Sequence, residues 1–140
     1  MANEIFTAYT LPGILSAFGT PSSILIRAEN DVIPGPVEMF ITLLYPEQGV
    51  FVRYTMPNER KGDIFLGCPS KAFIGMWLIP PNIGDNYQDI LSLQDSWEGN
   101  LYGITPLEEA TQMTVDEFYQ TFKEPTDICV QTPVDIWPNP

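Results

Sequence analysis

Two cysteines, Cys68 and Cys129, are the residues whose chemistry could most change how this chain folds. They lie too far apart in the sequence to form a CxxC redox motif or a zinc knuckle. A disulfide between them would close a loop of about 60 residues and would stabilise the fold by about 4 kcal/mol, because it lowers the entropy of the unfolded chain. Two buried, reduced thiols would instead be typical of a cytosolic protein. The sequence leaves both states open.

The chain has no histidine, which excludes several kinds of catalytic and metal site. Histidine is the most frequent general base and metal ligand, so Ser-His-Asp, Cys-His and histidine–metal chemistries are impossible here. No GxGxxG or Walker pattern is present, so no phosphate-binding loop is predicted. The oxygen-rich segment 82–89 departs from the EF-hand spacing of calcium ligands. We therefore expect no catalytic residue, no metal site and no cofactor.

Paired carboxylates are the remaining route to acid–base catalysis. Glu108 and Glu109 are adjacent, but neighbouring positions of a helix point in different directions, so this pair does not converge. Any two of the 18 acidic residues could still meet in the folded chain. A carboxylate-dependent hydrolase is therefore kept as one alternative.

Large aromatic residues and acids occur together between the last predicted strand and the C-terminal helices. Exposed aromatic rings beside acids suit the recognition of a protein or a sugar. Ordinary core packing is the alternative, because large aromatic side chains are mostly buried. The candidate interaction surface consists of Trp77, Tyr87, Trp97, Tyr102, Asp85 and Asp89.

Acidic side chains outnumber basic ones by 18 to 6, which gives a net charge of −12. Most of the excess lies in residues 84–140, where Lys123 is the only base. Such a charge repels phosphate groups, so nucleic acids and anionic membranes are not expected partners. A basic protein would be attracted.

The elements that must position these residues begin with a helix and continue with strands. Leu11, Ile14, Leu15 and Phe18 form one apolar stripe between the N-cap Thr10 and the helix-terminating Gly19. β-type residues predict strands at 23–27, 38–45, 50–55 and 72–79, with a further short strand at 64–66. The second and third of these should form an antiparallel hairpin.

Helices are predicted in the C-terminal part. Two capping boxes, Thr105 with Glu108 and Thr114 with Glu117, each indicate a helix start, and a weaker helix is expected at 86–93. The proline-rich tail 123–140 should pack on the fold, since it carries Ile128, Val130 and Trp137. The prediction is one α+β domain over residues 1–140, with an antiparallel sheet of about four strands, an N-terminal helix and two or three short C-terminal helices.

The cellular compartment is not fixed by the sequence. No segment reaches the ~20 apolar residues that a membrane-spanning helix needs. No basic segment precedes an apolar one at the start of the chain, as it would in a signal peptide. We expect either a cytoplasmic protein or the mature part of an exported one, and the extracytoplasmic compartment is slightly favoured.

The run from Leu11 to Ser23 combines a helix, the residues Gly19-Thr20-Pro21 and an extended segment. It resembles the LGxP helix-to-strand junction of small bacterial outer-membrane-assembly lipoproteins of the SmpA/BamE type, and β-lactamase inhibitor protein is similar. Phe18 stands where leucine is usual in those families. The resemblance implies helices packed on an antiparallel sheet and the binding of other proteins without catalysis. It covers about a tenth of the chain and carries over no functional residue.

The leading hypothesis is a non-catalytic, protein-binding module of an exported bacterial protein. The first alternative is a cytoplasmic, immunity- or antitoxin-like acidic inhibitor of a basic partner, and the second is the carboxylate-dependent hydrolase. A disulfide would count strongly against the cytoplasmic inhibitor. The oligomeric state stays open.

Overall fold

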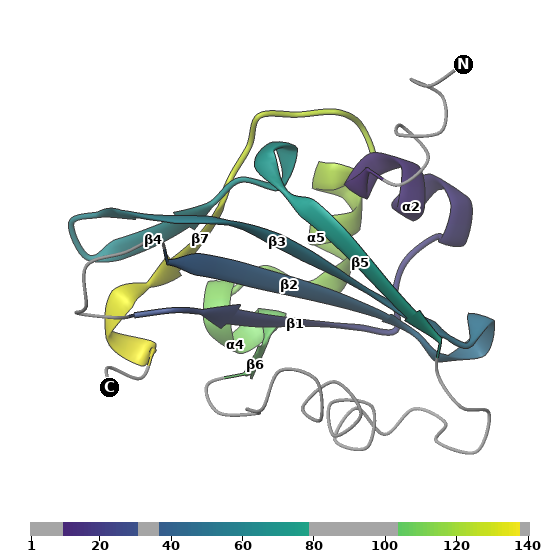
Figure 1. The fold of residues 1–140 in the computed structure, drawn as a ribbon, viewed down its shortest axis with the longest axis horizontal. Helices are drawn as coiled ribbons and strands as arrows, with labels where there is room; N and C mark the ends of the chain where they lie inside the picture. The colour runs from purple at the N-terminus through teal and green to yellow at the C-terminus, as the bar shows by residue number, and fades with distance from the viewer. Residues whose placement is uncertain (1–9, 31–36, 79–103, 138–140) are drawn as a thin grey trace.

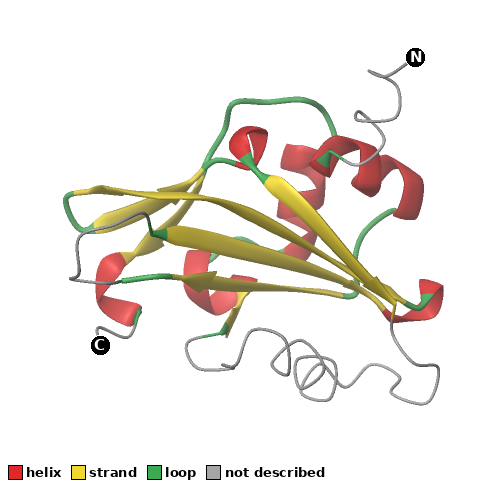
Figure 2. Ribbon diagram, in the orientation of Figure 1, coloured by secondary structure: helices red, strands yellow, loops and turns green. Residues whose placement is uncertain are grey.

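A computed structural model describes residues 10–30, 37–78 and 104–137, with residues 76–78 described by their backbone alone. In these residues a curled antiparallel sheet carries three α-helices on one face (Figure 1). The helices are α2 (Leu11–Phe18), α4 (Leu107–Thr111) and α5 (Val115–Phe122). In Figure 2, α4 and α5 are seen behind the strands, and α2 lies at the upper right.

The sheet has seven strands among the described residues, so the expectation of about four was wrong. Six of them follow the order β6-β1-β2-β3-β4-β7, and β5 also pairs with β3. Two strands were missed because β6 has only two residues, one of them proline, and β7 has four residues in the proline-rich tail. The strands are β1 (Ser23–Ala28), β2 (Glu38–Tyr45), β3 (Val50–Lys61), β4 (Ile64–Gly67), β5 (Phe73–Leu78), β6 (Thr105–Pro106) and β7 (Val130–Pro133).

The hairpin of β2 and β3 has the predicted antiparallel pairing, with Tyr45 opposite Val50 and Glu38 opposite Pro57. β3 does not end at Thr55 as expected but continues through Pro57 to Lys61. Proline lacks a backbone N–H and is tolerated where a strand's pairing ends or changes. Pro57 lies at such a point, because β3 beyond it pairs with β4 in place of β2 and β5.

The core lies between the sheet and the helices. Side chains alternate between the two faces of a strand, so every second residue of β1, β2 and β3 points toward the helices. α5 contributes Phe118 and Phe122, whose ring centroids are 4.7 Å apart. The sheet residues of this core are Ile24, Ile26, Ala28, Met39, Ile41, Leu43, Tyr45, Val50, Val52, Tyr54, Met56, Phe65 and Val130.

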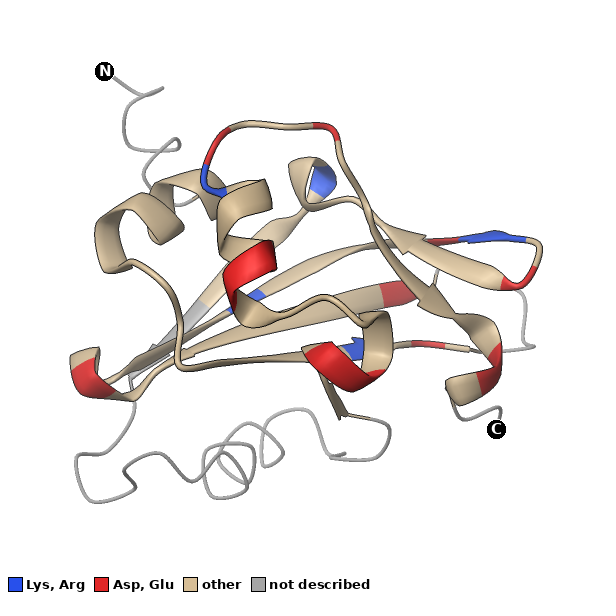
Figure 3. Cartoon of the chain, turned by 180° about the vertical axis from the view of Figure 1, so that it is seen from behind, with Lys and Arg blue, Asp and Glu red and all other residues tan. Residues whose placement is uncertain are grey.

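Two of the three described α-helices have the N-terminal cap that the sequence predicted. The N–H of Gly13 donates to Thr10 Oγ1 at the start of α2, and Thr114 and Glu117 form the predicted capping box of α5. The box predicted at Thr105 is wrong, because Thr105 and Pro106 pair with β1 and α4 begins only at Leu107. The first turns of α4 and α5 carry acidic residues, which the positive ends of the helix dipoles stabilise (Figure 3).

The C-terminal tail is held by a buried hydrogen-bond network as well as by β7. Thr132 Oγ1 donates to the carbonyl oxygen of Ala110 at 2.7 Å and accepts from Trp137 Nε1 at 3.0 Å. Val130 and Trp137 are buried as predicted, whereas Ile128 is 52% exposed and does not pack as expected. One hydroxyl therefore connects α4, β7 and the last turn of the described chain.

Replacing Thr132 by valine should lower the free energy of unfolding by about 2–4 kcal/mol, because Ala110 O and Trp137 Nε1 would lose their buried partner. Thr132→Ser keeps the hydroxyl and should cost about 1 kcal/mol for the lost methyl group. Urea unfolding followed by tryptophan fluorescence measures both. Equal losses in the two variants would contradict a role for the hydroxyl.

Candidate functional site

The structure contains the disulfide between Cys68 and Cys129, with the two Cα atoms 4.1 Å apart. Its position follows from strand register. Gly67 of β4 lies opposite Val130 of β7, so the next opposed pair along the two strands is Cys68 and Cys129. Opposed residues of antiparallel strands have closely spaced Cα atoms, which is what a disulfide requires. The disulfide therefore extends the pairing of β4 and β7 by one step.

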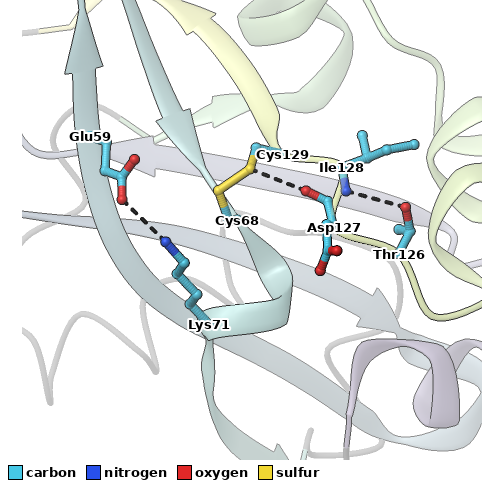
Figure 4. The surroundings of a disulfide bond; sticks show 7 residues. All are labelled: Glu59, Cys68, Lys71, Thr126, Asp127, Ile128 and Cys129. Carbon is cyan, nitrogen blue, oxygen red and sulfur yellow. Dashed lines mark hydrogen bonds and ion pairs between the residues drawn. A yellow bond between two sulfur atoms is a disulfide. The ribbon is translucent and has the colours of Figure 1, made fainter.

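A five-residue bulge, residues 68–72, begins at Cys68. Both β4 and β5 pair with β3, and the pairings Asn58–Gly67 and Thr55–Phe73 leave these five residues opposite only two of β3. The excess residues form a 3-10 turn, η2 (Pro69–Lys71), in which the Lys71 N–H donates to the Cys68 carbonyl oxygen. Lys71 Nζ also forms an exposed ion pair with Glu59 at 3.4 Å (Figure 4).

A second segment, residues 125–128, approaches the bulge from the other side of the disulfide. The N–H of Ile128 donates to Thr126 Oγ1 at 3.2 Å, which fixes a local turn before Cys129. Cys129 Sγ lies 3.5 Å from the Asp127 carbonyl oxygen (Figure 4). A disulfide sulfur carries no proton, so this is a contact and not a hydrogen bond. The disulfide thus ties the segment to the bulge at a fixed position.

Between these segments and the start of α2 lies a groove of about 670 Å³. Its wall from α2 consists of Thr10, Leu11 and Pro12. The lining is mostly apolar, and Asp127 is the only charged residue among the described residues that line it. The other described residues of the lining are Tyr54 of β3, then Pro69, Ser70, Ala72, Phe73 and Ile74 of the bulge and β5, and Pro125 and Thr126 of the second segment.

Exposed apolar side chains gather at this groove. Phe73 is 79% exposed and Ile74 is 37% exposed, and Ile128 follows directly after the wall residue Asp127. These are three of the four large apolar side chains that the described residues expose, and the fourth is Ile136. Grouped apolar exposure of this kind is a frequent mark of an interaction site.

Tyr54 forms part of the floor of the groove and is buried itself. Burial, with a smaller contribution from the nearby Tyr45, raises the pKa of the Tyr54 hydroxyl above its ordinary value. In its described part, the groove offers a ligand aromatic and aliphatic surface with one negative charge, at Asp127.

A second cluster lies on the sheet face that points away from the helices. Arg27 and Arg53 both lie over the ring of Phe40, at 5.4 Å and 4.8 Å from its centroid. Arg27 is directly opposite Phe40 in the pairing of β1 with β2. Cation–π contacts of this kind stabilise neighbouring strands. We interpret this cluster as structural.

The interaction surface predicted from the sequence falls almost entirely outside the described residues. Trp77 belongs to β5, where its backbone lies opposite Phe51. Tyr87, Trp97, Tyr102, Asp85 and Asp89 lie outside the described residues, as does the helix expected at 86–93. That prediction stays a prediction.

The groove itself was not predicted. Its walls come from three segments distant in the sequence, and only the two cysteines indicated that two of them meet. In the part of the chain that the structure describes, no three acids or cysteines converge on a metal-binding position. None of the helices in those ranges is both long and apolar enough to span a membrane.

Comparison of the chain with known protein families, with curated proteins and with solved structures found no match. The resemblance of residues 11–23 to the SmpA/BamE junction stays a prediction. The groove and the disulfide are the features of the described residues that bear on function.

Replacing both cysteines by serine should lower the free energy of unfolding by about 4 kcal/mol, the value expected for opening a loop of this length. The test is urea unfolding of the wild-type protein and the Cys68→Ser/Cys129→Ser variant. Wild-type protein in reductant is the matched control and should unfold like the variant. An unchanged midpoint, or two free thiols in protein from an oxidising host, would contradict the disulfide's role.

Proposed function

We propose that this chain is a non-catalytic protein-binding module that acts in an oxidising, extracytoplasmic compartment. The observation that carries the proposal is the exposed Phe73 at the mouth of an apolar groove. An aromatic side chain can bury 150–250 Å² on binding, and aromatic residues dominate the energetics of many interfaces. Phe73 and Ile74 would supply this contact.

The partner that suits the groove best is a segment of another protein with an apolar side chain flanked by basic residues. The apolar side chain would fill the groove between Leu11 and Ile74. Asp127 in the wall and the net charge of −12 would attract the basic residues. Acidic residues of α4 and α5 extend the negative charge over the helical side of the fold (Figure 3).

The disulfide supports the extracytoplasmic compartment, because such bonds persist where thiols are oxidised. It counts against the cytoplasmic acidic inhibitor. The carboxylate-dependent hydrolase would need two carboxylates at one site, and the described residues of the groove lining include one, Asp127. A binding role therefore has more support than either alternative.

Selection of short random peptides displayed on phage against the oxidised protein tests this proposal. We expect enrichment of peptides in which lysine or arginine flanks an apolar residue. The enriched peptides would then be synthesised and their affinities measured. The Phe73→Ser substitution should lower these affinities at least about tenfold, since it removes a central aromatic contact. Their affinity should also fall as salt rises, because charge attraction is screened.

The matched control is Ile136→Ser, which removes another exposed apolar side chain, one that does not line the groove. It should leave the affinity of the same peptides unchanged in fluorescence-polarisation titrations. No enriched peptide, or equal losses from both substitutions, would contradict a binding role for the groove.

A further inference from the structure

We propose that the partner segment binds as an additional strand along the outer edge of β5. This inference rests on the proposed binding function and specifies how the segment is held. Among the described residues, β5 pairs with β3 and with no other strand. Alternate residues along its other edge therefore direct N–H and C=O groups away from β3, toward the position of a further strand.

The geometry of β4 and β7 indicates where that strand would lie. β4 and β5 follow one another along the same side of β3, separated by the bulge at residues 68–72. β7 covers the outer edge of β4, and its pairing extends to the disulfide. An added strand would cover the outer edge of β5 in the same way that β7 covers the outer edge of β4.

The sequence of β5 has none of the features that usually discourage pairing at the edge of a sheet. Natural edge strands are usually short or carry charges or proline, which discourage pairing with other chains. The other edge strands fit that rule, because β6 has two residues and contains Pro106, and β7 has four residues and ends at Pro133. β5 has six residues, FIGMWL, with no charge and no proline.

The groove lies at the beginning of this edge. A bound segment could therefore form main-chain hydrogen bonds with β5 and place an apolar side chain in the groove at the same time. Ile74 is opposite Tyr54 and faces the helices, whereas Phe73 is opposite Thr55 and belongs to the other face. An added strand alternates its side chains in the same way. One set would enter the groove beside Ile74, and the other set would cover Phe73.

The occupant is a cationic segment of a different protein and not a second copy of this chain. Two copies would bring net charges of −12 together at this edge, which disfavours their association. A segment with lysine or arginine beside its apolar residues would meet Asp127 at the groove wall. Recognition would combine main-chain hydrogen bonds with one apolar pocket, as in strand addition generally.

Backbone N-methylation of an enriched peptide tests the strand directly. In an added strand only alternate residues direct their N–H groups to β5, so N-methylation of one alternate set should weaken binding at least about tenfold. N-methylation of the other set should change the affinity little. Ile74→Lys should also weaken binding, and Ile136→Lys, the same change at another exposed isoleucine, should not.

Three results would overturn the inference, and they are distinguishable. If both methylated peptides bind like the parent, the segment is held by side chains alone, and the proposed binding function survives without the added strand. If no peptide is enriched, the proposed function itself fails. If sedimentation shows a dimer of the peptide-free protein that the Ile74→Lys substitution dissociates, the edge is occupied by a second copy.

Discussion

The pairing of β3 is the constraint on which the rest of the structure depends. β3 pairs with β2 along one edge, and along the other it pairs first with β5 and then with β4. β4 and β5 share this one edge of β3. The chain that connects them therefore has to leave the sheet, and it forms the bulge at residues 68–72. The disulfide then fixes this bulge to the segment before β7. The hydrogen bond from the Ile128 N–H to Thr126 Oγ1 lies within residues 125–128 and does not join that segment to the bulge, so the disulfide is its covalent tie there.

The groove follows from the same arrangement. The bulge and the start of β5 supply one wall, the segment before Cys129 supplies another, and the capped first turn of α2 closes the third side. Tyr54, on the strand that both neighbours share, forms the floor. An apolar surface that stays exposed at such a junction contributes little to the free energy of folding, since burial of apolar area is the main favourable term in folding. This exposed surface is the feature on which the proposed binding function rests.

Local patterns in the sequence predicted part of this fold. The stripe of α2 and the Thr114 capping box needed only near neighbours, and so did the β2–β3 hairpin. The rest depends on pairings between distant segments. β6 pairs with β1 across about eighty residues, and nothing in the dipeptide Thr105-Pro106 identifies it as a strand. Its capping-box pattern predicted a helix start at Thr105, but Thr105 and Pro106 pair with β1 and α4 begins at Leu107.

The groove could not be predicted for the same reason, because its lining depends on the β3 register and on which thiols are joined. The two cysteines carried the relevant information, but their sequence separation is compatible with either redox state. Hydrogen exchange of the oxidised protein and the double-serine variant tests most directly whether the disulfide holds the groove walls. In the double-serine variant, protection should fall in residues 64–72 and 125–133, while β1, β2 and the first half of β3 keep theirs. Equal loss throughout the chain, or no loss in these two segments, would contradict it.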